Sequence, residues 1–368
     1  MSAIYKALEA LGKGGSLFVY ADAAAKDIEL ASTVADLAKK KRIKVYPFLF
    51  PSDCSSNAGF NLLAEASGGQ LFGLSDRSDA GVATTLVDTV VSANAVEIMS
   101  VDTSSLDGGS LKRRQDTSGH FVIPVDSAMT QLTFSLSGTA AKLQIKRPDS
   151  SSVSALNSDV THINLSGGQL VTIALPAPGM WAVDVVINAT YSLSVSGVSP
   201  LSLSSFQHVE LRGRAGHQGF FPVNGTPPAS SGATTIAQID GNSTEATFEY
   251  RTSAGAVISY LKLTHGGGNA DDPVASNVFY GNVTIPSSNF TVYVVGKDGA
   301  GAPFQRVLPA RFIYTVSNGT DSTNTTTPCM ASLSSSDSAS LTSMSASPPA
   351  EYSTVSLNTW SKYVSHAG

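Results

Sequence analysis

The pattern of apolar and polar positions changes once along this 368-residue chain. Up to about residue 96, uncharged apolar runs alternate with segments whose apolar residues recur at helical spacing. Beyond residue 97, apolar and polar residues alternate with a period of two, which is typical of strands with one buried face. The change of period predicts an α/β region that is followed by all-β regions.

The first region predicts successive strand–helix units. Strands are expected at 16–20, 44–50 and 70–73, and helices at 4–11, 26–41, 60–66 and 79–93. The run from Ser16 to Tyr20 carries no charge, so we expect a strand that is buried on both faces. Strands joined through helices pair in parallel with right-handed crossovers. Asp22 follows the first strand, at the carboxyl end where open α/β sheets bind ligands.

The regions 97–202 and 203–316 read as strands without helices between them. The clearest strands are expected at 121–125, 131–136, 142–146, 170–175, 180–186, 191–195, 247–250, 257–263, 290–295 and 311–316. Such a series predicts two β-sandwiches. The last region, 317–368, is rich in Ser and Thr and poor in apolar residues. It cannot bury enough surface to offset its conformational entropy, so we expect a disordered tail.

Several phrases in the chain resemble those of one extracellular family. Phe18-Val-Tyr-Ala-Asp-Ala and Ala66-Ser-Gly-Gly-Gln-Leu-Phe resemble the von Willebrand factor A domain of hemicentin-type proteins. Ile123-Pro-Val-Asp and Pro176-Ala-Pro-Gly-Met-Trp are similar to the galactose-binding-like module of that family. Lys297-Asp-Gly-Ala-Gly and Phe304-Gln-Arg resemble its Ig-like module.

The resemblance implies a multidomain fold. Residues 1–96 correspond to the C-terminal half of a von Willebrand A domain, a partial α/β, Rossmann-like sheet. Two all-β sandwiches follow, a galactose-binding-like one at 97–202 and an Ig-like one at 203–316, before the disordered tail at 317–368. The name of the galactose-binding-like module describes its fold and does not imply a bound sugar.

The same resemblance places Asp22 on the last aspartate of the A domain's metal-ion-dependent adhesion site. The other parts of that site, a D-x-S-x-S strand end and a threonine, are expected upstream of Met1, and D-x-S-x-S occurs nowhere in this sequence. One carboxylate alone binds a hard cation weakly. We therefore expect no cofactor in this chain and Mg²⁺ or Ca²⁺ only in an intact parent domain. Asp22 itself is expected to cap a helix or to face solvent.

Composition narrows the class of partner. The net charge of −5 provides no basic field for nucleic acid. No run approaches the roughly 18 apolar residues of a membrane span. Glycosylation sequons of the form N-x-S/T, taken as a set, indicate a secreted, extracellular glycoprotein. They occur at Asn164, Asn188, Asn224, Asn242, Asn282, Asn289, Asn318 and Asn324.

Catalytic patterns are missing from the sequence. The six histidines form no H-E-x-x-H motif, and neither a G-x-S-x-G elbow nor a phosphate-binding glycine loop occurs. His265-Gly-Gly-Gly is expected to be a hairpin loop. Trp181 is either a sugar platform or a core residue, and its alternation with Val183 and Val185 favours the core.

These observations predict a non-enzymatic extracellular protein of the adhesion or matrix type. It would bind extracellular proteins or matrix through its incomplete A domain, which the two sandwiches carry. The alternative is a lectin-like protein that binds glycans through residues 97–202. A weaker alternative is a structural spacer without a ligand.

Overall fold

The computed structural model describes residues 1–50, 58–74, 94–103, 119–138, 142–165, 168–186, 191–212, 214, 219–223, 227–266, 277–308 and 311–312. The chain divides into two units, Met1–Ser322 and Thr323–Gly368, and every described residue lies in the first. The helix expected at 79–93, Cys54 and the tail at 317–368 lie outside the described residues.

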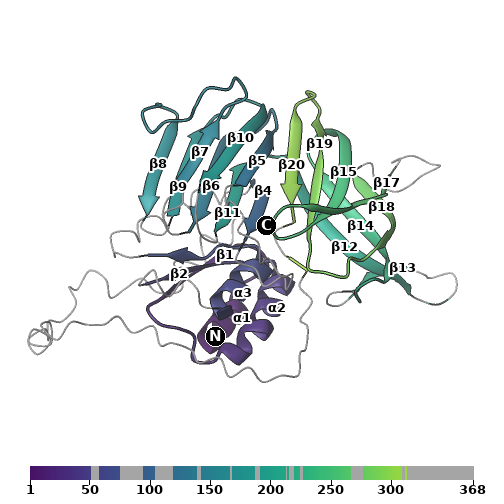
Figure 1. The fold of residues 1–368 in the computed structure, drawn as a ribbon. Coiled ribbons are helices and arrows are strands. Elements are labelled where there is room, and N and C mark those ends of the chain that lie inside the picture. The colour runs from purple at the N-terminus through teal and green to yellow at the C-terminus, as the bar shows by residue number, and fades with distance from the viewer. Residues whose placement is uncertain are drawn as a thin grey trace, which may run out of the picture. The chain divides into compact units, whose positions relative to one another are not determined.

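The first region is a small parallel sheet with helices, as the sequence predicts (Figure 1). Its elements are α1 (Ser2–Ala10), β1 (Ser16–Ala21), a 3-10 turn η1 (Ile28–Leu30), α2 (Ala31–Lys41), β2 (Lys44–Leu49), α3 (Ala58–Ser67) and β3 (Phe72–Gly73). The strands pair in parallel in the order β1-β2-β3. We call this region, residues 1–74, the A segment.

The expectation that the first strand is buried on both faces is wrong. β1 pairs with β2 on one side only and lies at the edge of the described sheet, so none of its residues is fully buried. The central position belongs to β2, where every residue after Lys44 is buried. The aromatic residues of β1 stack on those of β2 instead, with ring centroids 5.4 Å apart for Phe18 and Tyr46 and 5.0 Å apart for Tyr20 and Phe48.

The two faces of this sheet pack differently. α2 and α3 pack against β2, and the three helices gather on one side of the strands (Figure 1). On the other face, Tyr46, Phe48 and Phe72 form one apolar cluster with Leu170 of the first sandwich. Ile163 packs against the same cluster. A β-sheet from the next region therefore covers the face that the helices leave open.

The first sandwich consists of two antiparallel sheets. Its strands are β4 (Ala95–Asp102), β5 (Gly119–Val125), β6 (Gln131–Ser137), β7 (Lys142–Lys146), β8 (Val160–Leu165), β9 (Gly168–Ala174), β10 (Gly179–Val186) and β11 (Ser192–Val198). They are arranged as β5-β10-β7 and β4-β11-β6-β9-β8. The core between them includes Phe134 and Trp181, both fully buried. Sequence patterning missed β8, whose residues are at most half buried.

The second sandwich has the same construction. Its strands are β12 (Ser202–Arg212), β13 (Gly219–Pro222), β14 (Gly232–Asp240), β15 (Ser243–Arg251), β16 (Val257–Leu261), β17 (Thr264–His265), β18 (Val278–Thr284), β19 (Thr291–Asp298) and β20 (Pro303–Val307). They form the sheets β13-β12-β14-β18-β17 and β16-β15-β19-β20. His265 was expected in a loop, but it lies in strand β17 and pairs with Phe279 of β18. Of the strand expected at 311–316, the structure describes only a bridge between Phe312 and Phe290.

Candidate functional site

Asp22 lies immediately after β1 and is exposed to solvent. The residue at the N-cap position of the following 3-10 turn is Asp27, not Asp22. The Asp27 carboxylate accepts a hydrogen bond from the backbone N–H of Ser2 at 2.7 Å, at the start of α1. Of the two roles expected for Asp22, the structure thus places it in the solvent-facing one.

The described residues do not supply a cation site around Asp22. Nowhere among them do three or more His, Cys, Asp or Glu side chains come together in a group that could hold a metal ion. Hard cations such as Mg²⁺ and Ca²⁺ take six or more oxygen ligands, of which a single exposed carboxylate provides one or two. Among the described residues, this strand end is therefore an exposed surface with a single carboxylate.

Large apolar side chains surround Asp22 in sequence and are exposed. Tyr20 is 57% exposed, Ile28 45% and Leu30 36%. Tyr20 is held in place by its stacking on Phe48, and burial of part of its ring raises the pKa of its hydroxyl. We call Tyr20, Asp22, Ile28 and Leu30 the β1–η1 surface. The three apolar residues lie close together in the sequence, and exposed apolar side chains that form one patch are typical of protein contacts.

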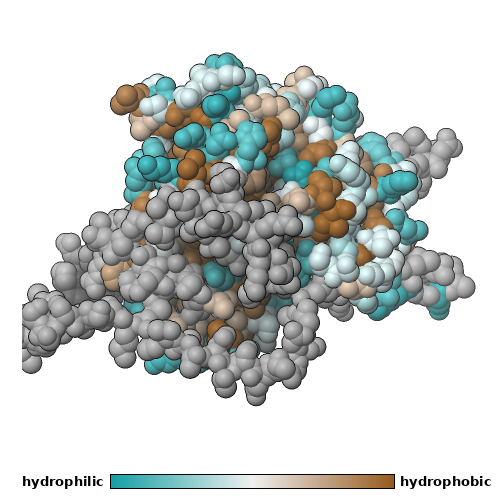
Figure 2. Space-filling view, viewed as in Figure 1, coloured by the Kyte–Doolittle hydropathy of each residue, from teal (hydrophilic) through white to brown (hydrophobic). Residues whose placement is uncertain are grey.

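Other exposed apolar residues are distributed over the sandwiches. Hydrophobic residues interrupt the hydrophilic surface at several separate places in Figure 2. In the first sandwich, Leu156 and Leu175 are 95% and 78% exposed. In the second, the exposed large apolar residues lie on β13 and β16: Phe220, Phe221, Val257, Ile258 and Tyr260.

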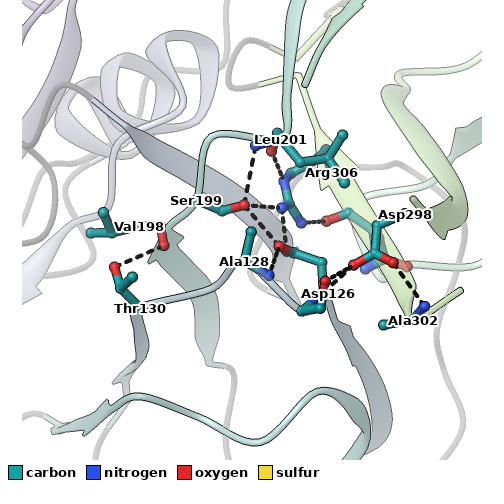
Figure 3. Close-up of polar contacts among 11 residues, drawn as sticks. Asp126, Ala128, Thr130, Val198, Ser199, Leu201, Asp298, Ala302 and Arg306 are labelled. Atoms are coloured by element: carbon teal, nitrogen blue, oxygen red, sulfur yellow. Dashed lines mark hydrogen bonds and ion pairs between the residues drawn. The ribbon is translucent and has the colours of Figure 1, made fainter. Parts of the chain in front are cut away.

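A buried charged cluster joins the two sandwiches (Figure 3). Arg306 of β20 is 1% exposed and donates to the carboxylate of Asp126, at the end of β5, at 2.5 Å. The same guanidinium donates to Ser199 Oγ at 3.0 Å and to the backbone carbonyl of Leu201 at 2.6 Å. Burial lowers the pKa of Arg306, and the charge of Asp126 opposes that effect. This ion pair has the hydrogen bonds that a buried pair requires.

The carboxylates of this cluster have further donors. Asp126 Oδ1 accepts from Ser199 Oγ at 2.9 Å and from the Ala128 N–H at 3.1 Å. Asp298, at the end of β19, accepts from the Ser127 N–H at 2.8 Å and from its Oγ at 2.6 Å. Burial opposes ionisation of Asp298, but the hydrogen bonds outweigh it and lower its pKa. We call Asp126, Ser127, Ser199, Asp298 and Arg306 the joint.

Two side chains of the second sandwich bind the backbone of β4, which is an edge strand. The Tyr293 hydroxyl accepts from the N–H of Ser100 at 3.1 Å and donates to its carbonyl at 2.9 Å. Gln305 Nε2 donates to the carbonyl of Ile98 at 2.9 Å. Free edges invite pairing with other chains, so these contacts protect β4 from that pairing.

Polar contacts also join the A segment to both sandwiches. Toward the first sandwich, Lys44 pairs with Glu97 at 2.9 Å, and Gln70 Nε2 donates to the carbonyl of Ser135 at 3.1 Å. Glu65 of the A segment pairs with Arg311, which follows the last strand of the second sandwich, at 2.9 Å.

The predicted sequons differ in accessibility. Asn164 in β8, Asn242 and Asn282 in β18 are exposed, whereas Asn289 is half-buried. The other four, Asn188, Asn224, Asn318 and Asn324, lie outside the described residues.

The tryptophan considered as a sugar platform lies in the core of the first sandwich. Trp181 is fully buried and donates from Nε1 to the carbonyl of Ala177 at 2.9 Å, as expected for a core residue. A small crevice in the first sandwich is lined by apolar side chains, among them Leu143, Ile145 and Val171, together with the polar residues Ser154 and His162.

Sequence reasoning missed the joint, although its residues lie in the phrases that carry the family resemblance. Asp126 ends Ile123-Pro-Val-Asp, and Arg306 ends Phe304-Gln-Arg. The sequence feature that could have indicated the joint is a charged residue at the end of a short predicted strand or of a phrase that carries the resemblance, as at Asp126 and Arg306. A charge in that position is normally assigned to solvent, so its burial could not be inferred.

Comparisons with known proteins agree with this architecture. A family model described as von Willebrand factor A domain matches residues 1–76, and one described as Hemicentin galactose-binding domain-like matches residues 110–200. Hemicentin-2 of Mus musculus is 23% identical over 313 residues, which cover 83% of this chain and 6% of that protein. Hemicentin-1 of Homo sapiens is 27% identical over 207 residues, which cover 55% of this chain and 4% of that protein.

The chain thus spans only a small part of the length of these relatives. Among solved structures, the Bacillus licheniformis lipase BlEst2 in its propeptide form aligns with 83% of this chain and 81% of that one, at 9% identity and a TM-score of 0.28. That score is too low to indicate a shared fold.

Proposed function

From the premise that this chain is a hemicentin-type protein, with a von Willebrand factor A segment before a galactose-binding-like domain, we propose that it is a secreted adhesion or matrix-type protein. It acts without catalysis, by binding other extracellular proteins. The A segment makes the contact and the two sandwiches carry it. The relatives are far longer, so the proposal concerns the part of such a protein that this chain represents.

The observation that carries the proposal is the β1–η1 surface. It presents three large apolar side chains within eleven residues of the sequence: Tyr20 near the carboxyl end of β1, and Ile28 and Leu30 in η1. Aromatic and aliphatic residues that are fixed before binding lose little conformational entropy on contact. Tyr20 meets that condition because it stacks on Phe48.

The test removes this surface and measures retention on matrix. The secreted chain and its variant Tyr20→Ser/Ile28→Ser/Leu30→Ser are applied to extracellular matrix laid down by cultured cells, and bound protein is quantified over a concentration series. We expect the triple variant to bind at least about tenfold more weakly, because losing even one residue that dominates a contact costs about 2 kcal/mol or more and about 1.4 kcal/mol is a factor of ten in affinity.

A matched control changes exposed apolar residues elsewhere. Leu156→Ser/Leu175→Ser removes two leucines from loops of the first sandwich and should leave retention unchanged. Equal retention of the triple variant and the parent chain would exclude the β1–η1 surface as the contact.

A second arm concerns the cation. Asp22 belongs to no group of three or more potential ligands among the described residues, so we propose that the contact uses apolar side chains and does not require Mg²⁺ or Ca²⁺. Retention should then survive a chelator and the Asp22→Asn change. Loss of retention in both experiments would instead assign a metal-dependent contact to this strand end.

A further inference from the structure

We infer that the joint locks the two sandwiches into one rigid body that folds cooperatively, so the galactose-binding-like sandwich is not an independent module. The inference deepens the proposed function, since its biological meaning rests on the role of the sandwiches as a carrier. Its test measures unfolding and shape, so it can fail while the binding proposal stands.

The connection between the sandwiches cannot act as a hinge. β11 ends at Val198 and β12 begins at Ser202, which leaves three residues between the sandwiches. Ser199 and Leu201 are buried, at 1% and 3% exposed. The Ser199 N–H donates to the carbonyl of Asn94, and the carbonyl of Leu201 accepts from Arg306 Nε. Flexible linkers are exposed and make few contacts. This connection is buried and hydrogen-bonded, so it is not a flexible linker.

Charge burial makes the arrangement specific. Arg306 and Asp126 come from different sandwiches and are 1% and 0% exposed. Together they are neutral, whereas either one alone would be an uncompensated charge in a dry site. Ser199, from the connection, donates to one and accepts from the other (Figure 3). The three groups fit only when both sandwiches and their connection are in place.

The apolar core is also continuous across the boundary. Tyr293 of β19 and Val307 of β20 belong to the core cluster of the first sandwich, at 0% and 3% exposed. The Tyr293 hydroxyl also satisfies the backbone of Ser100 on edge strand β4. Separation of the sandwiches would expose this core and open the β4 edge.

The test uses the whole chain and three variants. Arg306→Met leaves Asp126 buried and unpaired, and Arg306→Met/Asp126→Leu removes both charges. Lys297→Met is the matched control, because its ion pair with Glu245 is exposed. Unfolding is followed by scanning calorimetry, and the shape by small-angle X-ray scattering.

We expect one transition for the parent chain and for Lys297→Met. Arg306→Met should melt at least about 6 °C lower and split into two transitions, with a larger radius of gyration. The double variant should recover most of the melting temperature and the single transition, because replacing a buried pair by apolar residues is often neutral or stabilising.

Two transitions in the parent chain would overturn the inference, as would an Arg306→Met variant with an unchanged single transition. If Arg306→Met does not fold, hydrogen exchange in the parent chain decides the question. Amides of β4 and β20 that open with the same free energy support one cooperative unit. Much faster exchange across the whole of one sandwich contradicts it.

Discussion

His208, on β12, is a buried histidine. It is 5% exposed, its Nδ1 lies 2.9 Å from Thr235 Oγ1, and its Nε2 has no partner among the described residues. Its ring contacts Phe206 and Phe312 edge-on, with centroids 5.4 and 5.5 Å away. Burial lowers the pKa of His208 to about 4, and the charge of Lys39 adds to the shift. The ring is therefore neutral in the folded protein at physiological pH.

This histidine should make stability depend on pH. The unfolded chain binds the proton near pH 6.5 and the folded chain only near pH 4, so stability is full above about 6.5 and falls as pH drops through that window. Between pH 7.5 and 5.0 we expect the free energy of unfolding to fall by about 2 kcal/mol from this group. Urea unfolding at both values measures it.

His208→Gln serves as the comparison, since glutamine keeps a polar group near Thr235 and does not titrate. The variant should lose less stability than the parent chain over the same pH interval. Identical losses in both proteins would show that His208 does not contribute.

Single residues could be predicted from the sequence only where local pattern decides their environment. Trp181 alternates with Val183 and Val185, and all three are fully buried, as that period requires. The alternation of buried and exposed residues does not hold around Arg306. In β20 the four residues from Phe304 to Val307 are all buried, so both faces of the strand are covered. One face of β20 packs on its own sandwich and the other on the first sandwich, and a local sequence pattern cannot reveal a contact with another sandwich.

At the scale of elements, β1 and β2 show the same limit. Both are short runs rich in aromatic and β-branched residues, and both were correctly predicted as strands. Their order in the sheet depends on which strands pair, a non-local property. β1 was therefore expected to be buried on both faces, although it lies at the edge of the described sheet and β2 lies in the centre.

The turn between α3 and β3 depends on a glycine. A Cβ on Gly69 would lie 1.8 Å from the backbone carbonyl oxygen of Val45 in β2, so no side chain fits. We expect Gly69→Ala to lower the free energy of unfolding by about 3 kcal/mol, the cost of forcing backbone apart in a packed region. Chemical denaturation followed by circular dichroism measures the change.

Gly12→Ala provides the control for this prediction. A Cβ at Gly12 meets no atom within 4 Å, and its backbone is not in the left-handed region. Stability should change by less than about 1 kcal/mol there. If Gly69→Ala is equally mild, the turn at Gly69 must be able to move away from Val45 of β2 without loss of stability.

At the scale of the whole molecule, folding decides which sequons remain open to glycan. Asn164 and Asn282 are exposed on strands, so we expect N-glycans on both when the chain is secreted. Asn289 is half-buried and should remain unmodified. Asn242 is exposed, but its Nδ2 lies where a Cβ of Gly299 would be, at 2.0 Å, so we expect little glycan there. Mass spectrometry of deglycosylated peptides identifies the occupied sites, and a fully occupied Asn289 would contradict this reading of the surface.

Sequence periods separated an α/β region from all-β regions, and the observed elements follow that division. What the periods could not show is how the regions are held together. The joint, the capped edge of β4 and the aromatic face of the A segment all join residues that lie far apart in the chain, such as Asp126 with Arg306 and Ser100 with Tyr293.

These contacts close a ring. The A segment binds the first sandwich through Lys44 and Glu97, Glu65 of the A segment binds Arg311, and Arg306 binds Asp126 between the sandwiches. Modules strung in a row separate in succession under tension, each at its own weakest link. In a ring, any pull divides between two routes, so no region can be drawn away before a second contact yields. Under tension, the three regions are therefore expected to resist together and to yield in a single step.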